Sequence, residues 1–223
     1  MQRLMKKNSF VKKRQGFLLF FLLVAVLIFL DQWLKVWVKT NMTLYETIPV
    51  VGKWFYFYFV ENEGMAFGLS FGEDIGKLIL SLFRILISGF LIYYIVNLIK
   101  KEKIDVLTLS IFSLVLAGAL GNIIDSCFYG LIFSESTVYE TAIAFSAEGG
   151  YSKLFYGKVV DMFYLKLFYI PKWIPIFGGN YFFPAIFNIA DSCVTIGLAG
   201  LLIFNKRIFI PKKQDIPEDV RDV

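Results

Sequence analysis

The sequence predicts a mainly helical integral membrane protein, with four transmembrane helices, a small β-sheet outside the membrane and an extended second outer loop. Two observations predict this class. Apolar residues make up 57% of the chain and charged residues only 18%, which is far from the balance of an ordinary soluble domain. The apolar residues also gather in four stretches. Each is long enough for a helix that crosses the bilayer core, which takes roughly 20 residues. These stretches are residues 16–38, 78–99, 105–125 and 184–204. No segment repeats, so we expect one membrane domain over residues 1–223.

The basic residues lie on one side of the predicted membrane. Most of the 23 Lys and Arg residues fall before the first stretch, between the second and third, or after the fourth. They are Arg3, Lys6, Lys7, Lys12, Lys13, Arg14, Lys100, Lys101, Lys103, Lys206, Arg207, Lys212, Lys213 and Arg221. Because Lys and Arg are enriched in cytoplasmic segments, we expect both termini in the cytoplasm and loops 39–77 and 126–183 outside. The net charge of +5 is then a topology signal, and nucleic-acid binding is not expected.

The first stretch carries the first charged residues at membrane depth. It has no small-residue cleavage site before Asp31 and continues beyond it into Trp37, so we expect a retained helix rather than a cleaved signal peptide. Asp31 and Lys35 are four residues apart and therefore share one face of the helix. They could form an interfacial salt bridge or take part in function.

The first outer loop carries a strand signal. Residues 54–60 are aromatic and β-branched, and Ile48-Pro49-Val50-Val51 is expected to form a preceding strand. A turn rich in Gly and Asn follows at residues 61–68. This sheet could simply anchor aromatic side chains at the membrane interface, or it could be a platform for an extended peptide.

Two stretches end with the same polar pattern. Asn122 and Asp125 close the third stretch, and Asn188 and Asp191 repeat the spacing at the outer end of the fourth. Each pair could cap a helix, bind a backbone amide or do chemistry. Gly118 and its small neighbours permit close helix packing nearby.

Two further charged residues need partners. Asp161 lies in the second outer loop between apolar residues, where a lone carboxylate would be costly unless it is paired or functional. It precedes Asp191 by about thirty residues, so the loop can fold back and bring the two together. Arg84 lies within the second stretch, where we expect it to reach the outer surface or pair with a buried acid.

The composition excludes several kinds of site. The chain has no histidine, which rules out Ser-His-Asp and Cys-His catalysis and His-based zinc sites. Residues 68–72 match the Gly-x-Ser-x-Gly pattern, which we interpret as coincidence without a histidine; a Ser–Lys pair stays open. We predict no metal and no cofactor. Cys127 and Cys193 are expected to be buried free thiols rather than a disulfide.

Five motifs together resemble the lipoprotein signal peptidases (signal peptidase II). In order they are Asp31-Gln32-Trp33-Leu34-Lys35, Asn62-Glu63-Gly64-Met65-Ala66-Phe67, Gly121-Asn122-Ile123-Ile124-Asp125-Ser126, Val159-Val160-Asp161-Met162 and Phe187-Asn188-Ile189-Ala190-Asp191-Ser192. The resemblance covers nearly the whole chain. It departs from the family pattern at Ser126, where the motif has arginine, and in residues 131–155, which look inserted. We expect this insertion to form a cap over the outer face.

The resemblance implies an aspartic endopeptidase. It would remove the signal peptide from diacylglyceryl-modified prolipoproteins by cleaving before the lipidated cysteine. The catalytic pair would be Asp161 and Asp191. The supporting or substrate-binding residues would be Asp31, Lys35, Asn62, Gly64, Asn122, Asp125 and Asn188. The family fold has four transmembrane helices with an extracytoplasmic β cradle and a small helix or lid.

Partners and location follow from the same resemblance. The expected partners are a lipid-modified prolipoprotein and membrane lipids, and the protein is expected to be a monomer. Its expected location is the bacterial cytoplasmic (inner) membrane, with the site on the outer, periplasmic face.

Two other functions remain as alternatives. A proton-coupled transporter or channel also uses intramembrane carboxylates, but it predicts polar residues throughout the membrane, whereas here they gather at the outer ends. A non-catalytic scaffold predicts that Asp161→Asn and Asp191→Asn each leave function intact.

Overall fold

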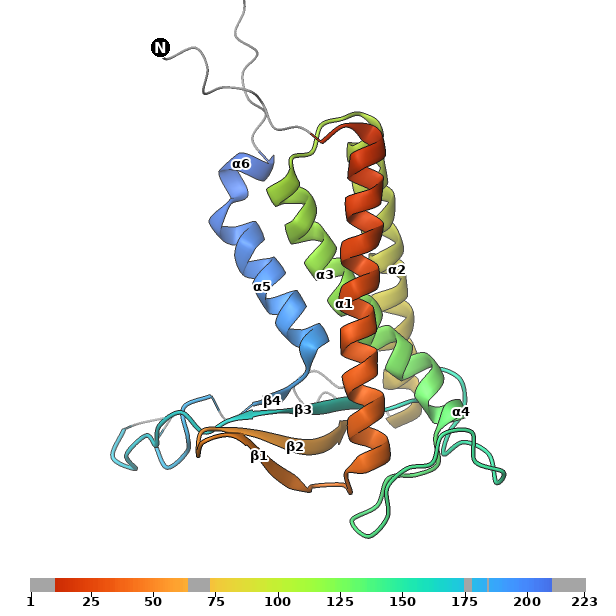
Figure 1. Cartoon of the computed structure of the whole chain (residues 1–223), viewed down its shortest axis with the longest axis vertical. Helices are drawn as coiled ribbons and strands as arrows, with labels where there is room; N and C mark the ends of the chain where they lie inside the picture. The colour runs from red at the N-terminus through yellow and green to blue at the C-terminus, as the bar shows by residue number, and fades with distance from the viewer. Residues whose placement is uncertain (1–10, 64–72, 175–177, 184, 210–223) are drawn as a thin grey trace, which may run out of the picture.

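A bundle of upright helices stands on a small β-sheet (Figure 1). The computed structural model describes residues 11–63, 73–174, 178–183 and 185–209. The bundle consists of α1 (Lys13–Asn41), α2 (Glu73–Lys100), α3 (Val106–Ile124) and α5 (Ile189–Ile203), and a short α6 (Asn205–Phe209) follows. Below α3 the chain continues through a π-helical turn, η1 (Asp125–Tyr129), into α4 (Gly130–Ile132).

Helix α3 is the centre of the bundle and packs against α1, α2 and α5. Asp105 caps its start, because the Asp105 side chain accepts a hydrogen bond from the Thr108 amide at 2.8 Å. Glycines on the facing surfaces bring α3 and α5 close together. A side chain at Gly118 would overlap the Ala190 carbonyl oxygen, and one at Gly197 would lie 3.0 Å from the Val115 nitrogen. The predicted packing role of the small residues near Gly118 is therefore confirmed.

Within the described part of the chain, three helices are long and apolar enough to cross a membrane: Lys13–Asn41, Ile75–Lys100 and Val106–Ile132. The third does not end at residue 125 as predicted, because η1 and α4 extend it to Ile132. The predicted start of the fourth stretch at residue 184 is also wrong. Residues 186 and 187 pair as a strand, Asn188 caps the helix, and α5 is an apolar helix of only 15 residues.

The sheet has four antiparallel strands in the order β1-β2-β3-β4. They are β1 (Thr47–Val51), β2 (Phe55–Asn62), β3 (Val159–Leu165) and β4 (Ile186–Phe187). The two strands predicted in the first outer loop are β1 and β2. Strands β3 and β4 were not predicted from the sequence. Asp161 was expected in a loop, but it lies on β3, an inner strand of the sheet. The pairing of β2 with β3 shifts between Phe57 and Val60, next to the partner of Asp161. Such bulges often redirect side chains near functional sites.

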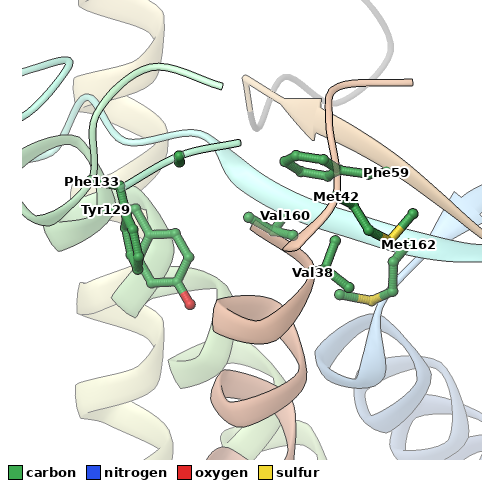
Figure 2. Packing of buried hydrophobic residues seen from close by; sticks show 8 residues of the cluster. Val38, Met42, Phe59, Tyr129, Phe133, Val160 and Met162 are labelled. Carbon is green, nitrogen blue, oxygen red and sulfur yellow. The ribbon is translucent and has the colours of Figure 1, made fainter. Parts of the chain in front are cut away.

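One face of the sheet is closed by the end of α1 (Figure 2). Val38 and Met42 from α1 meet Phe59 from β2 and Val160 and Met162 from β3, and all five are buried. Tyr129 and Phe133 extend this core towards α4. Because side chains alternate along a strand, burial of Val160 and Met162 on this face turns Asp161 to the other face.

The opposite end of the bundle carries the basic groups. There the backbone nitrogen of Lys13 donates to Glu102 at 3.2 Å, and Arg207 pairs with Asp105 at 2.6 Å. These contacts tie the start of α1, the α2–α3 turn and α6 together at the end away from the sheet (Figure 1).

The segment that the sequence predicts to be an insertion, residues 131–155, begins in α4 and bonds to neighbouring elements. Its backbone bonds back to α4 through Ser152 N to Gly130 O at 2.8 Å. It bonds to the end of α1 through Ala142 N to Lys39 O at 3.1 Å, and Leu44 N donates to Thr137 O at 2.8 Å. The insertion is thus joined to the same helix end that packs on the sheet.

The close approach of α3 and α5 predicts different effects for two glycine substitutions. Gly118→Ala should destabilise the protein by about 1–3 kcal/mol, because the added methyl group overlaps backbone. Gly89→Ala is the matched control, since a Cβ at Gly89 meets nothing within 4 Å. It should leave stability unchanged or raise it slightly. Thermal unfolding in detergent measures both, and equal effects would contradict this packing.

Candidate active site

A buried ammonium group lies where the helices meet the sheet. The Nζ atom of Lys35 is 3.0 Å from an oxygen of Asp31 and 2.8 Å from an oxygen of Asp125. It also donates to Asn122 Oδ1 at 2.9 Å. An ammonium group has three protons to donate, so these three partners satisfy it. Because Lys35, Asp31 and Asp125 are all buried, each charge depends on the others for compensation.

The two carboxylates beside Lys35 fasten the next elements in turn. Asp31 Oδ1 accepts a hydrogen bond from the Ala190 amide at 2.8 Å. That amide lies in the first turn of α5, where backbone N–H groups have no partner within the helix. Asp125 Oδ2 accepts from the Val160 amide at 3.2 Å. One acid therefore fixes the start of α5, and the other fixes β3 beside Asp161.

Asn188 joins these elements directly. Its Nδ2 atom is 2.7 Å from Asp161 Oδ1, 3.2 Å from Asn122 Oδ1 and 3.2 Å from the Val160 carbonyl oxygen. Its Oδ1 atom accepts from the Asp191 amide at 2.8 Å, and Asp191 Oδ2 accepts from the Asn188 amide at 3.3 Å. This capping box orients the Asp191 side chain as part of starting α5.

The two candidate catalytic carboxylates thus share a framework of amides. Asn122 Nδ2 donates to Asp191 Oδ1 at 2.8 Å, and Asn188 bonds both Asn122 and Asp161. On the other side Asn62 Nδ2 donates to Asp161 Oδ2 at 3.3 Å. The arrangement connects Asp161 on the sheet to Asp191 on α5 through side chains that cannot ionise.

The surroundings change the acidity of Asp161. Burial is the largest cause, and with the negative charge of Asp191 it raises the pKa of the Asp161 carboxyl from 3.8 to about 7. The hydrogen bonds from Asn62 and Asn188 and the charge of Lys35 oppose this rise. A carboxyl group that exchanges its proton near neutral pH is suited to acid–base chemistry.

Most of the residues singled out from the sequence meet at this point. Asp31, Lys35, Asn122, Asp125 and Asn188 form the network around Asp161 and Asp191, and Asn62 reaches it from β2. Gly64 and the Gly-x-Ser-x-Gly segment at residues 68–72 lie outside the described residues.

Other predictions from the sequence can also be compared with the structure. Asp31 and Lys35 form the expected salt bridge, at 3.0 Å, and both are buried in the protein. Arg84 is half-buried and lies close enough to Asp191 and Asp125 to attract them. Cys127 and Cys193 are free and buried, as expected. Among the described residues, no group of three His, Cys, Asp or Glu side chains could hold a metal ion.

The sequence reading missed Gln32 as part of the network. Its Nε2 atom donates to Asp125 Oδ1 at 2.9 Å and to the Gly121 carbonyl oxygen at 3.1 Å. Its Oε1 atom accepts from the Tyr129 hydroxyl at 3.1 Å. The signal was available, because Gln32 lies inside the first motif between Asp31 and Lys35. A neutral amide is less costly to bury than a charged group, so it is a weaker indication of a functional site.

Comparison with known families identifies this arrangement. The family model described as signal peptidase (SPase) II matches residues 23–206, a range that includes every residue of the network. The chain belongs to the signal peptidase II family. Lipoprotein signal peptidases from two strains of Porphyromonas gingivalis are 46% identical to it over 203 residues, which are 88% of each chain. The lipoprotein signal peptidase of Amoebophilus asiaticus is 38% identical over 194 residues, which are 84% of this chain and 76% of that relative.

Solved structures share the fold of this signal peptidase II family member. A bacterial membrane enzyme solved by the in meso method at 2.3 Å resolution superposes with a TM-score of 0.58 and 23% identity. The match covers 88% of this chain and 93% of that one. A second such enzyme, solved at 1.9 Å resolution, gives a TM-score of 0.55 and 24% identity over 86% of this chain and 94% of its own. A mainly helical membrane fold with a small antiparallel sheet is therefore shared with them.

The role of Lys35 predicts a large loss of stability when its charge is removed. Lys35→Met leaves Asp31 and Asp125 buried without a cation, which should cost about 3–5 kcal/mol of unfolding free energy. Lys77→Met is the matched control, because Lys77 pairs with the exposed Glu63 at 2.7 Å. That change should cost about 1 kcal/mol or less. Denaturant unfolding in detergent compares the two variants, and similar losses would refute the central role of Lys35.

Proposed function

We propose that this protein is an aspartic endopeptidase that works at the outer membrane–water boundary of the bacterial inner membrane. Its reaction is removal of the signal peptide from diacylglyceryl-modified prolipoproteins, with cleavage just before the lipidated cysteine. Membership of the signal peptidase II family supports the reaction. The single observation that supports the chemistry is the linkage of Asp161 and Asp191 through Asn122 and Asn188.

In this mechanism the two carboxyl groups hold one proton between them. The ionised carboxylate takes a proton from water while the water oxygen attacks the scissile carbonyl carbon. The protonated carboxyl donates its proton to the carbonyl oxygen, which gives a tetrahedral diol. The carboxyl that took the water proton then donates it to the amide nitrogen, and the other carboxylate takes a proton from a diol hydroxyl. The C–N bond breaks, which releases an amine and a carboxyl terminus and leaves one proton on the pair. Since such pairs titrate jointly, neither aspartate is assigned as the base.

The asparagines keep the pair oriented during these steps. Asn188 and Asn62 occupy one oxygen each of Asp161, and Asn122 occupies one oxygen of Asp191. Amide groups hold a carboxylate in place without adding a charge or a competing proton. This suits a reaction in which protons must pass only between water, the pair and the substrate.

An apolar row on the sheet suits the lipid-modified substrate. Phe163 lies two residues after Asp161, so both side chains point to one face of β3. Its ring centroid lies 5.7 Å from that of Phe55, 5.9 Å from that of Phe57 and 5.6 Å from that of Phe187. These rings form a continuous apolar row across β2, β3 and β4 beside the proposed catalytic pair. We propose that it contacts the acyl chains and the extended peptide.

The proposed placement in the membrane uses the three long helices and the shorter α5. Helix α5 would be a fourth crossing, and the sheet would lie on the periplasmic face. The basic groups at the far end of the bundle support cytoplasmic termini. The protein would act as one domain over residues 1–223 and as a monomer, with membrane lipids around it.

A proton-coupled transporter or channel is supported less well. The buried ionic network lies at the sheet end of the bundle, whereas the other half of the bundle holds an apolar cluster. That cluster includes Phe20, Ile99, Leu109 and Phe112 from α1, α2 and α3. A carrier of protons needs polar groups through the depth of the membrane, whereas this half of the bundle is filled by apolar side chains.

The proposed pair predicts that two conservative substitutions remove activity. Asp161→Asn and Asp191→Asn should each lower the cleavage rate of a lipid-modified proprotein in detergent by about 10²–10⁴-fold or more, since proton transfer is lost. Asp105→Asn is the control, because Asp105 pairs with Arg207 at the far end of the bundle. Thermal unfolding checks that all three variants fold. Full activity in either active-site variant would rule out the pair.

The raised pKa of Asp161 predicts the pH dependence. Because the carboxyl loses its proton near pH 7, kcat/KM should fall as the pH rises through about 7, when the pair loses its shared proton. Initial rates between about pH 5 and pH 9 in one buffer system measure this limb. A rate that stays constant up to pH 9 would show that the reaction needs no such proton.

A further inference from the structure

A second buried ionic cluster lies behind the proposed active site, at the end of α1. The ammonium group of Lys39 forms an ion pair with Glu61 on β2 and a hydrogen bond of 2.9 Å with Ser136 Oγ of the insertion. The Ser136 hydroxyl donates to Glu61 Oε1 at 2.8 Å. Lys158, which precedes β3, lies 3.6 Å from Glu61 Oε2. The cluster therefore joins α1, β2, the insertion and the approach to β3.

The cluster is enclosed by the insertion as well as bonded to it. Lys39 is fully buried, and the Glu61 side chain is 4% exposed. The Lys39 Nζ atom lies 4.9 Å from the ring centroid of Tyr151 and 5.6 Å from that of Phe133. The Tyr151 hydroxyl in turn accepts a hydrogen bond from the Lys158 amide at 2.7 Å. Rings and hydroxyls of the insertion thus replace water around the buried charges.

The hydrogen bonds of Ser136 argue against a Ser–Lys nucleophile here. A Ser–Lys catalytic pair needs a neutral lysine that can take the serine proton. Lys39 is instead ion-paired with Glu61, and the Ser136 hydroxyl donates its own proton to that carboxylate. Ser136 is also buried, which keeps a substrate away from its oxygen. If the cluster affects the reaction, it must do so by positioning neighbouring residues and not by taking part in bond cleavage.

Buried ion pairs are often no more stabilising than apolar side chains of the same size, but their bonds are directional. Here the directional bonds end on Glu61, and the next residue is Asn62. The Asn62 amide reaches Asp161 Oδ2 at 3.3 Å, near the long end of the hydrogen-bond range. A small displacement of this end of β2 would therefore break or strengthen that bond.

We propose that the insertion, through Ser136 and together with Lys158 that follows it, is a positioning device that holds Glu61 and thereby sets the contact of Asn62 with Asp161. The inference rests on the proposed function for its importance to catalysis. The positioning itself rests on contacts of Glu61 and Asn62 in the folded protein, which do not depend on the reaction. It differs from the expected cap, since the insertion acts on the sheet from behind the active site.

The direction of the effect follows from the groups that face Asp161. They are Asp191 and the capping residue Asn188 at the start of α5, Lys35 from α1 and Asn62 from β2. A hydrogen bond from Asn62 favours the ionised form of Asp161 and so lowers its pKa. Loss of that contact must therefore raise the pKa of Asp161. A variant that changes no charge isolates this effect from direct electrostatics.

Ser136→Ala is that variant, and Ser134→Ala is its matched control. Ser134 lies in the same insertion, but its hydroxyl accepts from the Ile143 amide within the loop, at 2.9 Å. The Asp161 carboxyl is followed by infrared difference spectroscopy against Asp161→Asn, from about pH 5 to pH 9. We expect the titration midpoint to move upwards by a few tenths of a pH unit in Ser136→Ala and to stay in place in Ser134→Ala. The high-pH limb of kcat should move with it while KM stays unchanged.

A double variant and a second single variant complete the test. In an Asn62→Ala background, Ser136→Ala should cause no further shift, because the contact is already gone. If Ser136→Ala does not fold, Glu61→Asp keeps the charge and shortens the reach, and the same upward shift is expected. An unchanged midpoint in the folded variant, or an equal shift with Asn62→Ala already present, would overturn the proposal. Absence of peptidase activity in the unaltered protein would count against the proposed function alone, since the infrared midpoint needs no turnover.

Discussion

The buried ammonium group of Lys35 is the interaction on which the rest of the structure depends. It lies in a region that excludes water, where an unpaired charge would be several kcal/mol too costly to keep. Two carboxylates and one amide oxygen satisfy it. Since α1 supplies Lys35 and Asp31 while α3 and η1 supply Asn122 and Asp125, the need to satisfy one charge fixes these helices relative to each other. The glycines of α3 make this possible, because a side chain at Gly121 would collide with Asp31.

The positions of the proposed catalytic groups follow from that centre. Asp31 holds the first turn of α5 through Oδ1, while its Oδ2 contacts Lys35, and Asp125 holds the start of β3 through Oδ2, the same oxygen that contacts Lys35. These two elements carry Asp191 and Asp161 one residue further on. Asn188 then closes the connection between helix and sheet. A chain of directional bonds thus runs from a buried cation to two carboxyl groups at the junction of the bundle and the sheet.

The sequence was sufficient to predict the helices and the grouping of the polar residues. The long apolar stretches became α1, α2 and α3, and the aromatic run in the first outer loop became β2. The repeated Asn-x-x-Asp spacing drew attention to Asn122 and Asn188, and in the structure these residues bond Asp191 and Asp161. Asn122 lies in the last turn of α3, and Asn188 caps the first turn of α5. These two helix ends lie next to each other, so the two asparagines meet.

The sequence was not sufficient where pairing across the chain decides the structure. The start of α5 was placed too early because Ile186 and Phe187 are as apolar as a helix, and only their pairing with β3 makes them a strand. Asp161 was read as a loop residue because a strand that carries a charge lacks the usual alternation. The cluster of Lys39, Glu61 and Ser136 was also missed, since its members are 22 to 97 residues apart and share no motif.

The central claim is that Asp161 and Asp191 together bind the tetrahedral diol formed by water and the scissile carbonyl. The most direct measurement compares two lipid-modified peptides that differ only at the cleavage position. One carries a hydroxyl-bearing, non-cleavable mimic of the diol and the other a methylene group. We predict that the hydroxyl mimic binds the unaltered protein at least about 100-fold more tightly, as expected for a transition-state analogue. That difference should vanish in both Asp161→Asn and Asp191→Asn. Equal affinity of the two peptides for the unaltered protein, or a preference that survives in either variant, would contradict the account.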